Sequence, residues 1–187
     1  MKQYITQNNE KFVLYISETK IQARVKQLAR QINKDYKGRI PIFIGILNGA
    51  FVFMADLIRN VTIDCEVDFL KLSSYADAKI SSGNVTLLKE LNCQVEGRDI
   101  IIVEDIVDSG LSMDFMIRLI RDRNPRSFKI ISLLYKKDAL KIDVKIDYIG
   151  FTIPNYFVVG YGLDYGQKDR NLKGIYQLVD DHAPRKG

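Results

Sequence analysis

The sequence predicts an α/β fold, with a mostly parallel twisted sheet flanked by helices in a single domain. Two short, continuously apolar runs, residues 41–46 and 99–103, are typical of strands that are covered on both faces. Stretches with the apolar spacing of helices follow these runs, as in the strand–helix–strand units of a parallel sheet. The length of 187 residues fits one domain, and no repeat or flexible linker divides the chain.

Composition excludes several classes of protein. Apolar residues make up 47% of the chain and charged residues 27%, which does not fit a disordered protein. No apolar run approaches the roughly 20 residues that a membrane-spanning helix needs. The polar N-terminus has no apolar core of the kind found in signal peptides. We therefore expect a cytoplasmic protein that makes no contact with membranes.

Cysteine and histidine are too few for most metal or histidine-based sites. Cys65 and Cys93 stand 28 residues apart without metal-ligand spacing around them, so we expect reduced, half-buried thiols. The only histidine, His182, lies five residues before the C-terminus. Acid–base chemistry would therefore depend on carboxylates, lysine or tyrosine.

The net charge of +5 and pI of about 9.1 favour an anionic partner. The lysines and arginines are scattered, and those between Lys20 and Lys34 lie opposite an apolar helix face. This pattern is typical of a solvated helix face and not of a nucleic-acid footprint. An anionic small molecule explains the excess charge equally well.

The first half of the chain is predicted to contain three strands and two helices before a long loop. Ser17 and Thr19 offer N-caps for the first helix, and residues 19–22 fit a capping box. The predicted elements are a strand at 11–16, an amphipathic helix over 21–32, a buried strand at 41–46, a helix over 50–59, a half-exposed strand at 63–69, a polar loop at 73–83 and an edge strand at 85–91.

The second half continues the alternation of strand and helix. Its predicted elements are a buried strand at 99–103, a glycine-containing turn, a helix over 113–120 that Pro125 closes, a strand at 128–135 and strand candidates at 147–151, 157–160 and 175–179. Ligands of such sheets bind beyond the carboxyl ends of the strands. The loops after Ile46, Val103 and Tyr135 are therefore the expected location of a site.

Residues 103–112, which read VEDIVDSGLS, carry the densest chemistry. They end an apolar strand and begin a helix, so the backbone N–H groups of residues 108–112 should converge into an anion-binding nest. Glu104 and Asp105 would repel a phosphate there unless they face ribose hydroxyls or Mg²⁺. A ribose 5-phosphate with Mg²⁺ nearby satisfies both features. The alternative is an acidic strand end followed by an ordinary N-cap.

This decapeptide resembles the phosphoribosyl-pyrophosphate-binding motif of the type I phosphoribosyltransferases. More narrowly, the chain resembles the hypoxanthine(-guanine) phosphoribosyltransferases along most of its length. The resemblance implies an α/β domain with a small hood region and a mobile lid loop, and relatives that form homodimers or homotetramers. The supporting segments, besides the decapeptide, are residues 45–50, 74–75, 134–137 and 157–165, with Arg170 at the expected distance.

The resemblance implies a purine salvage reaction, in which the 5-phosphoribosyl group of phosphoribosyl pyrophosphate passes to hypoxanthine or guanine. Asp108 would be the general base and Lys136 would bind the 6-oxo group. The implied residues are Glu104, Asp105, Asp108, Ser109, Gly110, Leu111 and Ser112 for ribose and phosphate; Asn48, Gly49 and Arg170 for pyrophosphate; Ile106, Lys136, Phe157, Val158 and Asp164 for the purine; Glu104, Asp105 and Asp164 for Mg²⁺; and Ser74 and Tyr75 for the lid.

Asn48 departs from the family pattern, because many relatives carry lysine at this place in the loop. Asparagine removes a cation from the pyrophosphate site, so we expect backbone amides and Arg170 to bind pyrophosphate. The resemblance also allows a cis peptide bond between Leu47 and Asn48.

Three other functions remain open at this point. An RNA-binding attenuator of pyrimidine operons has the same fold and motif, but Lys136 and residues 157–165 resemble a purine site. A phosphoacceptor signalling domain would place its acid pair after the first strand. A ligand sensor without activity would be expected to lack more of the polar site residues than the loop lysine alone.

Overall fold

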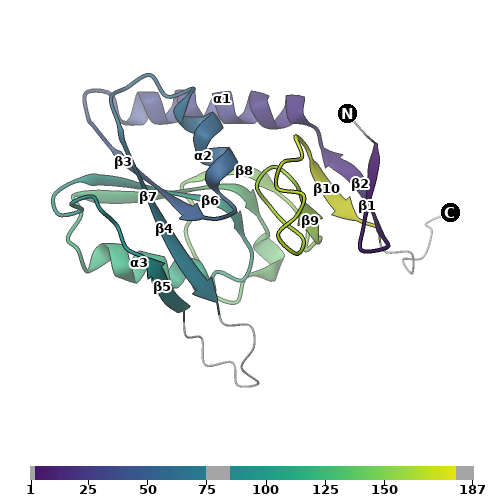
Figure 1. The fold of residues 1–187 in the computed structure, drawn as a ribbon. Coiled ribbons are helices and arrows are strands. Elements are labelled where there is room, and N and C mark those ends of the chain that lie inside the picture. Colours follow the sequence, from purple (N-terminus) through teal and green to yellow (C-terminus); the bar gives the residue numbers. More distant parts are fainter. Residues whose placement is uncertain (1–2, 75–84, 180–187) are drawn as a thin grey trace.

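The computed structural model describes residues 3–74 and 85–179 and contains two sheets (Figure 1). The larger sheet has six strands in the order β5-β4-β3-β6-β7-β8. The smaller sheet has four strands in the order β1-β2-β10-β9. The strands are β1 Tyr4–Gln7, β2 Glu10–Ile16, β3 Ile42–Leu47, β4 Glu66–Ser74, β5 Val85–Lys89, β6 Asp99–Val107, β7 Ser127–Tyr135, β8 Tyr148–Thr152, β9 Val158–Val159 and β10 Ile175–Leu178.

The larger sheet is mostly parallel, which confirms the predicted fold class. Strands β4, β3, β6, β7 and β8 pair in parallel, and only β5 runs antiparallel to its neighbour β4. The central strands β3 and β6 pair in register from Ile42 with Ile100 to Gly45 with Val103. Their carboxyl ends therefore lie at the same edge of the sheet, where the loops that follow them meet.

Helices cover both faces of this sheet (Figure 1). The helices are α1 Glu18–Asp35, α2 Phe51–Ile58, α3 Leu111–Arg121 and a short 3₁₀ turn, η1, Lys137–Ala139. Ile101 and Val103 of β6 pack in the cluster formed with α1 and α2, whereas Ile100 and Ile102 pack in the cluster formed with α3. Because successive side chains of a strand point to opposite faces, a segment buried on both faces, such as residues 100–103, is apolar at every position.

The small sheet lies beside the large one and carries the two ends of the described chain (Figure 1). Phe12, Val159 and Tyr176 form its own buried cluster. The sequence did not predict β1, whose residues Tyr4–Gln7 alternate between exposed and half-buried positions. Strand β1 forms by pairing with β2. The hydrophobic pattern of only four residues does not indicate such a pairing.

The predicted capping box and two predicted strand boundaries were wrong. Ser17 alone caps α1, accepting from the amide of Lys20 at 3.4 Å, and Thr19 already lies inside the helix, so the capping box is absent. Strand β4 begins at Glu66 and not at residue 63. Strand β6 continues to Val107 because Ile106 and Val107 still pair with β7. The acid pair Glu104–Asp105 therefore belongs to the strand and not to the turn after it.

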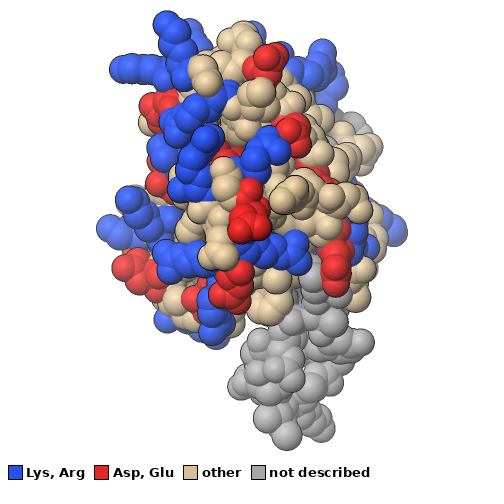
Figure 2. Space-filling view, turned by 90° about the vertical axis from the view of Figure 1, so that its left-hand side faces the viewer, with Lys and Arg blue, Asp and Glu red and all other residues tan. Residues whose placement is uncertain are grey.

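Other predictions on composition can be compared with the described residues. Cys65 and Cys93 are free and half-buried, as expected. On the face shown in Figure 2, basic side chains are interspersed with acidic ones. None of the helices in the described ranges has the length and apolar character needed to cross a membrane. Cytoplasmic location and single-domain organisation stay predictions, and His182 lies outside the described residues.

Candidate functional site

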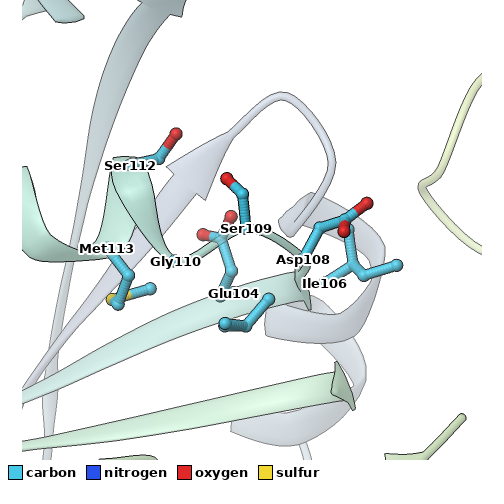
Figure 3. A pocket seen from close by; sticks show the side chains of 8 residues that line it. Glu104, Ile106, Asp108, Ser109, Gly110, Ser112 and Met113 are labelled. Carbon is cyan, nitrogen blue, oxygen red and sulfur yellow. The ribbon is translucent and has the colours of Figure 1, made fainter. Parts of the chain in front are cut away.

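A polar pocket lies where β6 ends and α3 begins, at the predicted edge of the large sheet (Figure 3). Its volume is about 90 Å³. The lining residues are Glu104, Ile106, Val107, Asp108, Ser109, Gly110, Ser112 and Met113.

Residues 108–110, in the turn before α3, line this pocket. Gly110 is the N-cap of α3 and has φ of 81°, a left-handed conformation that favours glycine. A Cβ atom at Gly110 would lie 2.7 Å from the carbonyl oxygen of Ile142, so the turn also needs glycine for space. The first N–H groups of a helix lack intrahelical acceptors and carry the positive end of the helix dipole. Together with the hydroxyls of Ser109 and Ser112, they can hold a phosphate.

The two acids of β6 lie beside this nest, where Asp105 is buried and Glu104 is half-buried. Burial, followed by the charge of Asp105, raises the pKa of Glu104 well above its usual value. Burial also raises the pKa of Asp105 to about 6, although the backbone amide of Ile106 donates to its Oδ1 at 2.9 Å. Oε2 of Glu104 is buried and has no hydrogen-bond partner among the described residues. Such carboxylates suit a ligand that brings hydroxyl donors or a cation.

Because Glu104 and Asp105 are adjacent in a strand, their side chains leave it on opposite sides. Glu104 lines the pocket with Ser109, whereas Asp105 contacts the loop after β3. A Cβ atom at Gly49 would collide with the carboxylate of Asp105. Glu104 and Asp105 were predicted together to contact the ribose and Mg²⁺, but in the structure the two side chains have different neighbours.

The loop after β3 is held between Asp105 and a turn of the small sheet. The peptide bond between Leu47 and Asn48 is cis, as the family resemblance allowed. Gly162 has φ of 102°, and a Cβ atom there would collide with the carbonyl of Gly49. The close approach on both sides requires glycine at both positions, so this loop has little freedom to shift.

Lys136, directly after β7, lies beside Asp108. Its side chain is only 8% exposed, and its ammonium donates to Oδ2 of Asp108 at 2.8 Å. The same ammonium donates to Oδ1 of Asn155 at 3.3 Å. The backbone amide of Lys136 donates to Val107 at 3.0 Å, which aligns the ends of β6 and β7. Asp108, the predicted general base, and Lys136, the residue predicted to bind the purine, are therefore in direct contact.

An aromatic side chain stands on the small-sheet side of this pair. Phe157 is 46% exposed, and its ring packs edge-on against Tyr165 with centroids 5.3 Å apart. Phe12 lies behind both, with its ring centroid 6.1 Å from each. Val158 follows in β9, paired with Gln177 of β10. Phe157 is thus a supported aromatic surface that is open to a ligand.

Asp164 and Arg170 lie on the turn after β9 and bind each other. The guanidinium of Arg170 contacts Oδ1 of Asp164 at 2.6 Å and donates to the carbonyl of Gly162 at 2.8 Å. Oδ2 of Asp164 accepts from the amide of Gln167 at 2.8 Å. The charges of Arg170 and Asp164 also act on the pKa of Asp105, so this turn reaches the acid pair.

Comparisons with known proteins agree with this arrangement. Residues 16–166 match the family described as "Phosphoribosyl transferase domain". A hypoxanthine-guanine phosphoribosyltransferase of Bacillus subtilis is 48% identical over 160 residues, which cover 86% of this chain and 89% of that protein. The chain belongs to the hypoxanthine-guanine phosphoribosyltransferases.

Further relatives of the same name extend the match. The Mycobacterium bovis hypoxanthine-guanine phosphoribosyltransferase is 44% identical over 174 residues, covering 90% of this chain and 86% of that protein. A crystal structure of the Bacillus anthracis enzyme is 42% identical, with a TM-score of 0.85, and covers 89% of this chain and 98% of that chain. These relatives give no support to the RNA-binding alternative.

Hypoxanthine-guanine phosphoribosyltransferases use a divalent metal ion. Among the described residues no group of three or more His, Cys, Asp or Glu side chains could hold a metal by itself. The buried Glu104 oxygen without a partner and the buried Asp105 nevertheless fit a cation that substrate phosphates also bind.

The structure brings most of the predicted phosphoribosyltransferase residues to one edge of the large sheet. The decapeptide, the loop of Asn48 and Gly49, and Lys136 all follow neighbouring strands there. Of the predicted lid, Ser74 ends β4, and Tyr75 lies outside the described residues. The individual roles of all these residues stay predictions.

Sequence reasoning missed two supports of this phosphoribosyltransferase site. Asn155 contacts Lys136. In the sequence, only its position two residues before Phe157 could have indicated this contact. The segment after η1 supports the nest, because the amide of Lys141 donates to the carbonyl of Ser109 at 2.9 Å. A backbone contact of this kind leaves no mark in the pattern of side chains.

Proposed function

We propose that this enzyme transfers the 5-phosphoribosyl group from phosphoribosyl pyrophosphate to hypoxanthine, and to guanine, releasing pyrophosphate. The observation that carries the proposal is the contact of Asp108 with Lys136, at 2.8 Å, beside the amide nest before α3. A residue that can take a proton from the purine and one that can bind its oxo group then stand next to a phosphate site.

The 5-phosphate would bind in the nest of residues 108–112, through backbone amides and the hydroxyls of Ser109 and Ser112. Glu104 and Asp105 would accept hydrogen bonds from the ribose hydroxyls. The orphaned oxygen of Glu104 supports this role, because a hydroxyl donor would satisfy it.

Magnesium is the divalent ion that we propose. Glu104 and Asp105 would hold one Mg²⁺ and Asp164 a second one, each together with substrate oxygens, which suits an ion that binds few protein carboxylates and keeps several waters. When bound, the ion neutralises charge on the pyrophosphate and on the buried acids. The pyrophosphate itself would contact Asn48, Gly49 and Arg170.

The purine would stack on Phe157, with the backbone of Val158 at its edge and Ile106 beneath it. Lys136 would donate to the 6-oxo group, which an amino group cannot replace because it offers no comparable acceptor. Binding of this kind favours 6-oxopurines over adenine. Phe157 is half-exposed, which leaves its ring available to the base.

In the reaction the purine nitrogen forms a bond to the anomeric carbon while the bond to pyrophosphate breaks. Positive charge that develops on the sugar increases the acidity of the purine, and Asp108 takes the proton that the purine loses. The atoms balance as one purine and one phosphoribosyl pyrophosphate giving one nucleotide, one pyrophosphate and one proton. Because water would compete for the sugar cation, closure of the lid that includes Ser74 and Tyr75 would exclude it.

A steady-state panel of five nucleobases tests the function. With phosphoribosyl pyrophosphate and Mg²⁺, hypoxanthine and guanine should give release of pyrophosphate, whereas adenine and uracil should not. The rate with xanthine shows whether the site also accepts this third 6-oxopurine. Turnover of uracil at the rate of hypoxanthine would contradict the proposal. We also propose self-association as a dimer or tetramer, which light scattering of the purified protein would measure.

A further inference from the structure

The ammonium of Lys136 is held by a second side chain besides Asp108. Asn155 lies in the bend between β8 and β9, two residues before Phe157, and its Oδ1 accepts from Lys136 at 3.3 Å. Lys136 is nearly buried, whereas Asn155 is exposed at the rim of the site. The contact joins the end of β7 to the loop that carries the aromatic surface.

The chemistry of the two groups fixes how they meet. A lysine ammonium has three N–H donors and no acceptor, so the carbonyl oxygen of the Asn155 amide, not its nitrogen, faces it. One donor is used by Asp108 and one by Asn155. The third is available to a ligand, and the two protein acceptors determine the direction in which it points.

The two acceptors respond differently to the reaction. Under the proposed function, Asp108 takes a proton from the purine and loses the negative charge that attracts Lys136. The amide of Asn155 does not titrate, so its carbonyl holds the ammonium throughout. Without it, Lys136 would be free to rotate or to follow Asp108 when the charge of that carboxylate changes.

We propose that Asn155 is a positioning residue, whose carbonyl oxygen keeps the Lys136 ammonium directed at the 6-oxo group of the purine. This inference rests on the proposed function of the site. Asn155 thereby contributes to recognition of the oxo group without touching the substrate. Its contribution should be limited to the purine, because the side-chain contact of Asn155 is with Lys136, the residue proposed to bind the purine.

The experiment compares Asn155→Leu, which removes the acceptor, with Asn155→Asp, which keeps an acceptor at the same length. Asn155→Ser is measured beside them in case leucine disturbs the loop. Tyr156→Phe is the control, since it alters the neighbouring residue while keeping the ring that packs on Tyr15 at 5.7 Å. The readouts are kcat and KM for hypoxanthine, KM for phosphoribosyl pyrophosphate, and the Ki of purine lacking a 6-substituent as a competitor of hypoxanthine.

We expect kcat/KM for hypoxanthine to fall about tenfold in Asn155→Leu, the effect of losing part of a hydrogen bond to a charged group. The Ki of unsubstituted purine and the KM for phosphoribosyl pyrophosphate should stay within about twofold of wild type. Asn155→Asp should recover most of the loss, Asn155→Ser should behave as Asn155→Leu, and Tyr156→Phe should resemble wild type.

Three results would overturn the inference. They are an unchanged kcat/KM in both Asn155→Leu and Asn155→Ser, an equal loss for hypoxanthine, unsubstituted purine and phosphoribosyl pyrophosphate, and an Asn155→Asp variant as impaired as Asn155→Leu. If the wild type is active and any of these results is found, the role of Asn155 is contradicted but the proposed function is not. A wild type that does not turn over hypoxanthine contradicts the proposed function and the inference with it.

Discussion

The ammonium of Lys136 lies 2.8 Å from Oδ2 of Asp108, although the two residues are 28 positions apart in the chain. Parallel pairing of β6 with β7 brings them together, because each residue directly follows its strand and Val107 pairs with Tyr135. A parallel sheet thus converts two distant strand ends into one site. The proton acceptor and the base-binding cation that we propose are fixed relative to each other before substrate binds.

Asp108→Asn should lower kcat by about a hundredfold or more, the effect of removing a general base. The asparagine amide still offers an oxygen to Lys136, so the arrangement of the site and the KM for phosphoribosyl pyrophosphate should change little. Steady-state kinetics with hypoxanthine measure both constants. Asp122→Asn, the same change at the exposed C-cap of α3, is the control. A kcat of Asp108→Asn near the wild-type value would exclude Asp108 as the base.

Lys136→Ala should raise the KM for hypoxanthine about tenfold or more, because a hydrogen bond from a charged group to the oxo oxygen is lost. Discrimination against adenine should weaken at the same time, since the group that distinguishes oxo from amino is gone. Competition by adenine against hypoxanthine measures this effect. Lys137→Ala removes an exposed neighbouring lysine and should leave both quantities unchanged. If the two variants behave alike, Lys136 does not bind the purine.

Much of this site could be predicted from sequence because its residues are close together in the chain. The nest, the acid pair and the glycine turn all lie within residues 103–112, where local pattern and chemistry coincide. Asn155 could not be found in this way, since its role depends on a contact with Lys136 across two strands. The end of β6 was misplaced because Glu104 and Asp105 are polar, whereas pairing with β7 continues past them.

The two sheets show the same limit at the level of the fold. Strand β3 and residues 100–103 of β6 were predictable, because burial on both faces requires apolar residues at successive positions. Strand β1 has only four residues, none of them fully buried, and lies at the edge of the small sheet, where it pairs with β2. Its position therefore depends on tertiary pairing, which single-sequence patterns do not contain.

Asp105→Asn should stabilise the metal-free protein at high pH. The folded-state pKa of Asp105, about 6, lies above the usual value of 3.8, so the folded state binds this proton more tightly than the unfolded state. Proton binding by Asp105 therefore stabilises the folded state fully below about pH 4, and this stabilisation is lost as the pH rises through about 6. The variant should therefore gain on the order of 3 kcal/mol in free energy of unfolding at pH 8 and little at pH 4.

Urea unfolding in EDTA, at several pH values between 4 and 8, measures this difference. Asp122→Asn is again the control, because it makes the same substitution at an exposed side chain. The stabilised Asp105→Asn variant should also be nearly inactive, because the Asp105 carboxylate, although its burial lowers stability, is needed to bind the substrate. A stability difference independent of pH would contradict the assignment of the raised pKa to burial of Asp105.

Gly49→Ala should impair binding of phosphoribosyl pyrophosphate, because the added methyl group would collide with the carboxylate of Asp105. Either the loop or the acid must move, and we expect the KM for phosphoribosyl pyrophosphate to rise about tenfold, equivalent to about 1.4 kcal/mol. Gly97→Ala is the control: Gly97 has φ of 69° but open space around its Cβ position. Alanine there should strain the backbone by about 1 kcal/mol without changing KM. Thermal unfolding and steady-state kinetics of both variants separate the two effects. If Gly97→Ala alters KM as much as Gly49→Ala does, the loss reflects general destabilisation and not the contact between Gly49 and Asp105.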